Sequence, residues 1–233
     1  MKHALVTGGT RGIGAGVART LARHGWSVVA ASVSQDELDA FAPQDGITTH
    51  LLDVTDQASV DALFGGLTGL DALVNCAGIL VRGAEYDIDT FARVLDVNLT
   101  GTMRCCLAAQ PLLAASGGAI VNTASMLSTF GGPLVPAYSA SKGGVAQLTK
   151  ALAGKWAEDG IRVNAIAPGW IETEMTQALR DDPARTAGIM ARTPLKRWGK
   201  PEDVGALVHW LLSDQASFVT GSVYPVDGGY LAM

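Results

Sequence analysis

Three residues of the chain carry side chains that could act together on one oxygen atom: Ser125, Tyr138 and Lys142. A helix is expected to contain Tyr138 and Lys142, and residues four positions apart share one helix face. A neighbouring ammonium group stabilises phenolate and lowers the pKa of tyrosine. The phenol could then exchange a proton with an alcohol or a carbonyl group. The Ser125 hydroxyl could orient the substrate and polarise its carbonyl oxygen.

A glycine-rich segment near the start of the chain could bind phosphate groups. It runs from Thr7 to Gly14 (T-G-G-T-R-G-I-G), after the first predicted strand and at the start of the first predicted helix. Glycines allow a tight turn and a close approach of the backbone to a pyrophosphate. The free N–H groups at the start of the helix would face that anion. Together with the acid–base residues, this segment indicates hydride transfer with a dinucleotide.

The elements that must position these residues alternate along the chain. Most of the predicted strands are short, continuous and aliphatic, which is typical of strands that helices cover on both faces. They are expected at 3–6, 27–31, 48–52, 72–74, 119–122, 162–166 and 222–226. Helices are expected at 13–24, 56–64, 89–115, 137–159 and 202–213. This alternation predicts the α/β class: a Rossmann-type, doubly wound parallel sheet of about seven strands with helices on both faces.

One domain is expected to take the whole chain, residues 1–233, and to hold both the NAD(P)-binding site and the catalytic site. There is no linker, repeat or low-complexity segment. Residues 170–199 differ from the rest because they are polar, charged and interrupted by Pro183 and Pro194. A long insert between the sixth strand and the last helix predicts a mobile substrate lid.

Composition excludes several classes of protein. Hydrophobic residues make up 48% and charged residues 17% of the 233 residues, which is enough for a large core. The net charge of −5 gives no support to nucleic-acid or anionic-membrane binding. We expect no signal peptide and no transmembrane helix. No array has metal-ligand spacing, and Cys76, Cys105 and Cys106 are expected to be reduced and buried. These features predict a cytoplasmic protein without a metal site.

The spacing T-G-x3-G-x-G, followed by Asn98, Ser125, Tyr138 and Lys142, resembles the short-chain dehydrogenase/reductase family over nearly the entire chain. The resemblance implies that Asn98, Ser125, Tyr138 and Lys142 are the catalytic set. Asn98 would hold a water in a proton relay through the lysine, and Lys142 would also hold the nicotinamide ribose.

The resemblance also implies a cofactor site that draws on several segments. Asp53 follows the third strand and would contact adenine, although the alternative is a helix-capping aspartate. Asn75-Cys76-Ala77-Gly78 looks like the family's N-N-A-G, with cysteine as a departure in the second position. Pro168-Gly169 resembles the P-G motif near the nicotinamide. The implied cofactor-binding residues are Gly8, Thr10, Arg11, Gly12, Ile13, Gly14, Ser32, Ser34, Asp53, Val54, Asn75, Ala77, Gly78, Tyr138, Lys142, Pro168, Gly169, Ile171 and Thr173.

The end of the second strand bears on the choice between NAD(H) and NADP(H). An acidic residue there would bind the ribose hydroxyls and repel a 2′-phosphate. Ser32 stands at that position, and Val33 stands where a basic residue is often found in NADP enzymes. Arg11 could supply a cation to a 2′-phosphate, while Ser32 and Ser34 could supply hydrogen bonds. These residues favour NADP(H), and NAD(H) stays open.

The substrate end of the site is expected to be mostly apolar. The candidate substrate contacts are Ser125, Met126, Leu134, Tyr138 and Trp170. The sequence resembles sugar-acid and polyol dehydrogenases of the family, which implies a small secondary alcohol or ketone as substrate. It also resembles 3-oxoacyl-carrier-protein reductases, so a 3-oxoacyl thioester is the alternative. A basic patch for carrier docking could come from Arg180, Arg185, Arg192, Lys196 and Arg197, diluted by Asp181 and Asp182.

Two other functions are open on the same scaffold. One is a regulator that senses NADP(H) without turnover, and the other is isomerase, dehydratase or dehalogenase chemistry. Degraded or altered catalytic residues would indicate them, whereas the set is intact. The resemblance further implies a homo-oligomer, commonly a tetramer, formed through the two long helices and the C-terminal strand and tail.

Overall fold

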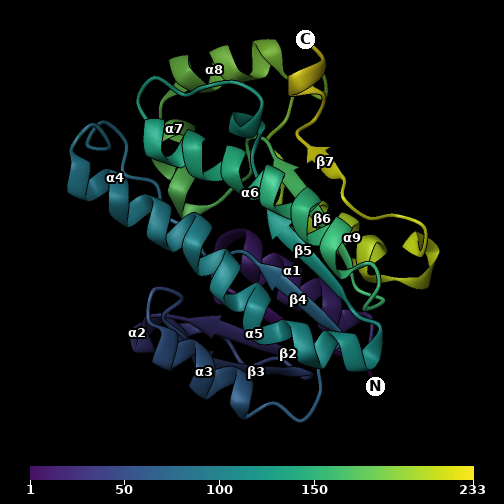
Figure 1. Ribbon diagram of the computed structural model, residues 1–233. Coiled ribbons are helices and arrows are strands. Elements are labelled where there is room, and N and C mark those ends of the chain that lie inside the picture. Colours follow the sequence, from purple (N-terminus) through teal and green to yellow (C-terminus); the bar gives the residue numbers. More distant parts are fainter.

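The computed structural model describes residues 1–233 and contains one seven-stranded sheet, in which all neighbouring strands are parallel (Figure 1). The strand order is β3-β2-β1-β4-β5-β6-β7. The strands are β1 (His3–Thr7), β2 (Ser27–Ser32), β3 (Ile47–Leu51), β4 (Ala72–Asn75), β5 (Ala119–Thr123), β6 (Arg162–Pro168) and β7 (Val223–Val226). The prediction of a Rossmann-type, doubly wound sheet is therefore confirmed.

Alternate residues of the central strands enter two separate cores, because successive side chains of a strand point to opposite faces. In β1, Leu5 belongs to one core, whereas Ala4 and Val6 belong to the other. In β4, Leu73 and Val74 separate in the same way. Short aliphatic runs can satisfy both cores only if helices cover both faces, as they do here.

The helices divide between the two faces. One face carries α3 (Gln57–Gly65), α5 (Gly101–Ser116) and α6 (Pro136–Trp156), with α4 (Ile88–Leu95) beside α6, and Figure 1 views the sheet from this side. The opposite face carries α1 (Gly12–Arg23) and α9 (Pro201–Leu212). Close packing of α1 on α9 depends on Gly16, where an added Cβ would lie 2.3 Å from the Cβ of Pro201.

The strand order reverses between β1 and β4, which are neighbours in the sheet. In such sheets ligands bind in the crevice at the carboxyl ends of the strands, where the order reverses. The glycine-rich segment begins at Thr7, the last residue of β1, and the segment Asn75–Gly78 begins at the last residue of β4. The Thr7 hydroxyl accepts a hydrogen bond from the backbone N–H of Ala77 at 3.1 Å, so the two segments lie side by side.

The structure differs from the sequence expectations at three places. The edge strand β3 is largely exposed, and its sequence, I-T-T-H-L, is mostly polar, unlike the aliphatic central strands. The predicted helix 89–115 is two helices, α4 and α5, joined by a π-helical turn, Asp96–Thr100. A further helix, α2 (Gln35–Ala40), was not predicted, and its Ser34 N-cap accepts a hydrogen bond from the Glu37 N–H.

The segment 170–199, which is predicted to be a substrate lid, is partly helical. It contains α7 (Gln177–Arg180) and α8 (Pro183–Arg192), and it buries Leu179 and Ile189. Its two ends are joined by a parallel bridge between Ile171 and Gly199. None of the helices combines the length and the hydropathy that a membrane span requires.

Candidate active site

Tyr138 and Lys142 lie in the first turns of α6, which begins with Pro136 at its first position. Proline is favoured there because its fixed φ suits a helix start and its missing N–H needs no partner. The Lys142 Nζ donates a hydrogen bond to the Thr123 backbone carbonyl at 2.7 Å. The same nitrogen lies 5.5 Å from the centre of the Tyr138 ring. The helix thus carries the phenol and the ammonium group together to the end of β5.

The two side chains have shifted proton affinities. Burial lowers the pKa of Lys142 to about 8. Burial also raises the pKa of Tyr138, an effect that hydrogen bonding with Ser125 opposes and the Glu85 carboxylate reinforces. The expectation that Lys142 lowers the pKa of Tyr138 is not met in this structure. The reason is that desolvation of the phenolate is the larger effect, and the ammonium group is directed at the Thr123 carbonyl.

Ser125 stands just beyond β5 and caps the short 3₁₀ turn Met126–Ser128. Its Oγ accepts a hydrogen bond from the Leu127 N–H at 3.1 Å. The Ser128 hydroxyl in turn donates to the Lys142 carbonyl at 2.7 Å. The turn is therefore fastened to α6, which fixes Ser125 relative to Tyr138 and Lys142.

Asn98 lies in the π-helical turn, and its side chain is fully buried. Its Oδ1 accepts from the Ile79 N–H at 2.8 Å, and its Nδ2 donates to the Ile79 carbonyl at 2.9 Å and to the Ser141 hydroxyl at 3.1 Å. A Cβ added to Gly78 would lie 3.3 Å from Asn98 Oδ1 and 3.6 Å from Lys142 Nζ. The structure thus brings Asn98, Gly78 and Lys142 into one cluster.

A carboxylate that the sequence analysis did not single out supports this cluster. Glu85 is fully buried, and its two oxygens accept from the backbone N–H groups of Tyr138 at 2.8 Å and Val81 at 2.9 Å. An acidic residue rarely occupies such a place unless it is paired or hydrogen-bonded. Nothing in the spacing around Glu85 distinguishes it from a surface residue, so no sequence signal could have found it.

The glycine-rich loop fits a dinucleotide pyrophosphate. An added Cβ would lie 2.9 Å from the Ala77 backbone at Gly8, and 2.0 Å from the Gly8 carbonyl oxygen at Gly14. Only glycines allow this approach of backbone to backbone. The helix α1 that follows has neither a capping side chain nor an acidic residue in its first turn, so no side chain of the chain caps its first N–H groups. Gly12 contacts Thr173, whose Cγ2 would be 3.3 Å from an added Cβ.

The end of β2 holds a second carboxylate that the sequence analysis missed. The hydroxyls of Ser32 and Thr10 both donate to Glu37 Oε2, at 2.6 Å and 3.2 Å, and Arg11 Nε pairs with Glu37 Oε1 at 3.0 Å. No acidic residue is expected at this strand end from the sequence, and β2 itself has none. Glu37 comes instead from α2. The sequence does contain a feature that could have revealed Glu37. It is an acid shortly after the second strand that follows Ser34, a residue that can cap a helix.

Three further residues implied for the cofactor site lie just after β3 or at the end of β4. Asp53 Oδ1 accepts from the N–H and the hydroxyl of Thr55, and Asp56 caps α3, so Asp53 does not cap that helix. Val54 is buried against Gly101. Asn75 is buried and donates to Asn122 Oδ1 at 2.9 Å, which makes its contacts those of a structural residue within the sheet.

The residues that follow β6 join the crevice to the 170–199 segment. Pro168 ends the strand, and Gly169 packs so closely on Asp227 that an added Cβ would lie 2.7 Å from its Cα. Ile171 is buried, while Thr173 Cγ2 contacts Gly12. The segment therefore begins beside the glycine-rich loop.

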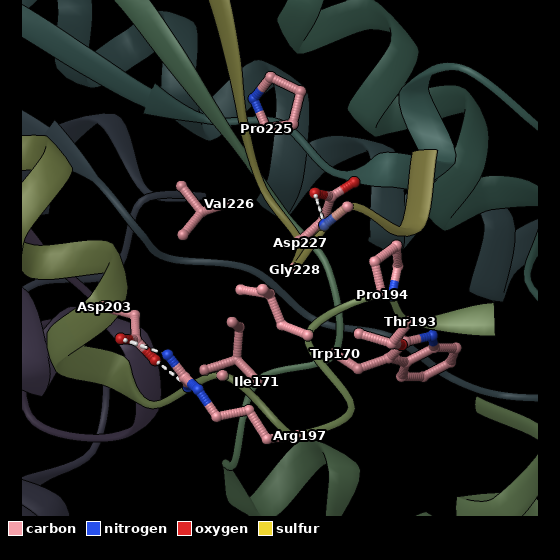
Figure 2. A pocket seen from close by; sticks show the side chains of 13 residues that line it. Trp170, Ile171, Thr193, Pro194, Arg197, Asp203, Pro225, Val226, Asp227 and Gly228 are labelled. Atoms are coloured by element: carbon pink, nitrogen blue, oxygen red, sulfur yellow. Dashed lines mark hydrogen bonds and ion pairs between the residues drawn. The ribbon is translucent and has the colours of Figure 1, made fainter. Parts of the chain in front are cut away.

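A cavity of about 490 Å³ lies between the ends of this segment, α9 and the exit of β7. Figure 2 shows the side chains that line it. Trp170 and Ile171 line it, but none of the four predicted catalytic residues does. Its charged groups are satisfied within the chain: Arg197 pairs with Asp203 at 2.7 Å, and Asp227 accepts from the Gly229 N–H at 2.9 Å. This cavity is therefore separate from the cluster around Tyr138.

The candidate substrate contacts differ in accessibility. Met126 is buried, Leu134 is 51% exposed and Trp170 is intermediate. Trp170 meets the Tyr230 ring edge-on, with ring centres 6.3 Å apart. The guanidinium of Arg192, at the end of α8, lies over the same Tyr230 ring at 4.4 Å and over Phe130 at 5.4 Å.

Comparison with known proteins agrees with this geometry. A family model described as enoyl-(acyl carrier protein) reductase matches residues 8–231. A 2-dehydro-3-deoxy-D-gluconate 5-dehydrogenase of Bacillus subtilis is 41% identical, covering 99% of this chain and 95% of the relative. A 3-oxoacyl-[acyl-carrier-protein] reductase of Thermotoga maritima is 37% identical, covering 98% and 97%.

A solved structure is similarly close. It is from Agrobacterium tumefaciens, assigned as a 2-deoxy-D-gluconate 3-dehydrogenase with bound NADP, and is 43% identical with a TM-score of 0.91. The match covers 100% of this chain and 97% of that one. Both sequence and fold therefore agree along the full chain, and we conclude that it belongs to the short-chain dehydrogenase/reductase family, as an NAD(P)(H)-dependent oxidoreductase that acts on CH–OH donors.

Proposed function

We propose that this enzyme interconverts a secondary alcohol and a ketone on a small sugar acid or related hydroxy acid, with NADP(H) as its preferred cofactor. The observation that carries the proposal is the cluster at the start of α6. There Ser125, Tyr138, Lys142 and Asn98 are joined through Ser128, Ser141 and the Thr123 carbonyl. This cluster stands at the end of β5, near the crevice that the glycine-rich loop borders.

Each catalytic residue has a distinct role in this proposal. The chemistry supplied by the bound nicotinamide is the acceptance or donation of a hydride. During alcohol oxidation Tyr138, as phenolate, takes the hydroxyl proton, and during ketone reduction its phenol returns it. The Ser125 hydroxyl holds the substrate oxygen where negative charge develops. Lys142 supplies positive charge near the phenolate, and Asn98 holds the backbone of Ile79 beside Lys142.

The cofactor would be held by residues from both halves of the crevice. The glycine-rich loop and the start of α1 would bind the pyrophosphate, while Arg11, Ser32 and Ser34 would face the adenosine ribose. Asp53 and Val54 would border the adenine. Lys142 would contact the nicotinamide ribose, and Ile171 and Thr173 would border the nicotinamide end.

A substrate carboxylate would bind Arg192. Its guanidinium rests on the rings of Phe130 and Tyr230 and is not neutralised by an ion pair with an acidic residue. Phe130 belongs to the connection between Ser125 and Tyr138, so the cation lies beside the catalytic segment. Arginine is suited to planar, bidentate recognition of a carboxylate. Related sugar-acid dehydrogenases support the same substrate class.

The thioester alternative has weaker support from the 170–199 segment, the predicted lid. A carrier-docking patch needs free basic groups, yet three of the five candidates are engaged in ion pairs. Arg180 pairs with Glu172 at 3.9 Å, Arg185 with Asp182 at 3.2 Å and Arg197 with Asp203 at 2.7 Å. We therefore rank a carrier-bound substrate below a free hydroxy acid.

We extend the proposal to location and assembly. The cysteines are free, and Cys105 and Cys106 are fully buried, which suits a reducing cytoplasm. Leu107 on α5 and Phe218, which precedes β7, are large exposed apolar side chains that a homotetramer through the long helices and the C-terminal strand could cover. Light scattering coupled to size exclusion would measure the mass in solution, and a monomer would exclude the tetramer.

The decisive experiment measures nicotinamide absorbance with a panel of sugar acids, polyols, simple ketones and a 3-oxoacyl thioester. Each compound is tested with NADP(H) and with NAD(H). We expect the highest kcat/KM for a carboxylate-bearing alcohol or ketone with the phosphorylated cofactor. Arg192→Ala should raise KM for that substrate about ten- to a hundredfold, with little change for neutral polyols. Preference for the thioester, or for neutral polyols, would contradict the proposed substrate class.

A further inference from the structure

The carboxylate of Glu37 occupies a place where three donors from two segments, the glycine-rich loop and the end of β2, converge. Ser32, at the end of β2, and Thr10, in the glycine-rich loop, donate to Oε2 at 2.6 Å and 3.2 Å. Arg11 Nε lies 3.0 Å from Oε1. Two hydroxyls and a guanidinium form the kind of set that binds a phosphate group, and here a carboxylate of the chain already fills it.

Burial distinguishes this contact from an ordinary surface ion pair. Ser32 is only 4% exposed and Thr10 is 9% exposed, and the Glu37 side chain is 25% exposed. The second carboxylate near Arg11 belongs to Glu174, which is 78% exposed and 3.3 Å from Nη1. Exposed pairs of the latter kind contribute little. Glu37 is therefore the acid that the cluster is built around.

The position of the cluster relates it to the adenosine ribose of a dinucleotide. In doubly wound folds an acid near the end of the second strand binds the ribose 2′-hydroxyl, whereas an arginine nearby accommodates a 2′-phosphate. Here the acid and the arginine are both present and bind each other. A 2′-hydroxyl could donate to the carboxylate where it lies. A 2′-phosphate would need the same three donors and would be repelled by the same charge.

We infer that Glu37 is a built-in substitute for the 2′-phosphate and sets the balance between NADP(H) and NAD(H). It accepts the ribose hydroxyl of NAD(H) in place, and it has to leave Ser32, Thr10 and Arg11 to admit the phosphate of NADP(H). The enzyme thus binds both cofactors, and its preference for NADP(H) is smaller than the three donors alone would give, because the carboxylate of Glu37 has to be displaced. This inference rests on the proposed cofactor site at the glycine-rich loop.

The test is a comparison of dissociation constants in the wild type and in Glu37→Gln, which keeps the shape of the side chain and removes its charge. Titrations of nicotinamide fluorescence give Kd for NADPH and NADH, and calorimetry gives Kd for 2′,5′-ADP and 5′-AMP. The two nucleotides differ only in the 2′-phosphate. Glu37→Gln should lower Kd for NADPH and for 2′,5′-ADP about tenfold or more and raise Kd for NADH.

Two matched variants control for general charge effects. Glu174→Gln removes the exposed carboxylate beside Arg11, and Asp36→Asn neutralises an exposed acid on the same short helix. Both should leave the ratio of the NADPH and NADH dissociation constants within about twofold of the wild type. Glu37→Ala provides a second removal of the charge and should shift the ratio in the same direction as Glu37→Gln.

The outcomes separate this inference from the proposed function. If the wild type and the variants bind both cofactors with an unchanged ratio, Glu37 does not set cofactor choice. An equal shift in Glu174→Gln would also overturn the inference, because any acid near Arg11 would then suffice. If the wild type binds neither cofactor, the proposed cofactor site itself is wrong.

Discussion

The carboxylate of Glu85 accepts a hydrogen bond at 2.8 Å from the backbone N–H of Tyr138, although the two residues are far apart in the sequence. No side chain of its own segment caps α6. The first N–H groups of a helix have no partner within the helix, so Glu85 caps α6 from outside. Its second oxygen binds the Val81 N–H at 2.9 Å, which ties the start of α6 to the segment after β4.

We predict that Glu85→Gln weakens catalysis while cofactor affinity is retained. A glutamine has one accepting oxygen, so one of the two N–H groups loses its partner, at a cost of about 1–3 kcal/mol in the free energy of unfolding. Displacement of Tyr138 should lower kcat about ten- to a hundredfold. Urea unfolding and steady-state kinetics measure the two effects, and Glu158→Gln, at an exposed position near the end of α6, is the control.

The pH profile of the same variant separates a positioning role from a merely structural one. The negative charge of Glu85 raises the pKa of Tyr138. Its removal lowers that pKa, so the phenolate required for alcohol oxidation forms at lower pH. The rising alkaline limb of the oxidation rate should therefore move to lower pH in Glu85→Gln. A limb that stays in place, with only stability reduced, would leave Glu85 as a structural cap.

Tyr138→Phe should remove the acid–base step and little else. The phenol exchanges a proton directly with the substrate in the proposed mechanism, and such steps contribute about 10²–10⁴-fold to the rate. We expect kcat to fall by that factor while Kd for the cofactor changes little. Stopped-flow kinetics with fluorescence titration would measure both. Retention of full activity would refute the proposed role of Tyr138.

The glycine-rich loop leads to a contrast between two glycine substitutions. In Gly14→Ala the added methyl group would lie 2.0 Å from the Gly8 carbonyl oxygen, so the loop has to move and cofactor binding should be lost. In Gly154→Ala, on the exposed side of α6, nothing lies within 4 Å. Alanine is the better helix former by about 1 kcal/mol, so this variant should be more stable. Thermal unfolding and cofactor titration test both expectations.

Much of the architecture could be predicted because each strand and each helix has its own local pattern of apolar residues. Short aliphatic runs alternating with helical patterns already specify a parallel sheet. The strand order β3-β2-β1-β4 then places the glycine-rich loop against Ala77. The spacing of Tyr138 and Lys142 within one helix fixes their shared face. Their catalytic roles remain predictions that the variants above test.

The features that could not be predicted depend on contacts between segments distant in sequence. Glu37 reaches Ser32 and Arg11 only because the short helix α2 turns back over the end of β2, and six residues give too little periodicity to predict such a helix. The sequence around Glu85 suggests an exposed acid. Its burial depends on the start of α6, which lies far away in the sequence and donates the Tyr138 N–H to it. The raised pKa of Tyr138 likewise follows from burial, which cannot be inferred from the sequence spacing of Tyr138 and Lys142.

The stability of the protein should depend on the titration of Lys142. Burial lowers its folded-state pKa from 10.5 to about 8. Below pH 8 both the folded and the unfolded chain hold the proton, and the cost of burying the charge is fully present. Between pH 8 and 10.5 the folded chain releases the proton while the unfolded chain retains it, so this cost declines as pH rises.

Lys142→Met removes this titration, so the comparison of the two proteins isolates it. From pH 7 to pH 10 the free energy of unfolding of the wild type should rise by about 2–3 kcal/mol relative to Lys142→Met. Urea unfolding of both proteins at matched pH values measures the difference. Other titrating groups are common to the two chains and largely cancel. A difference that stays constant across this range would mean that Lys142 keeps its proton in the folded state, held by the Thr123 carbonyl.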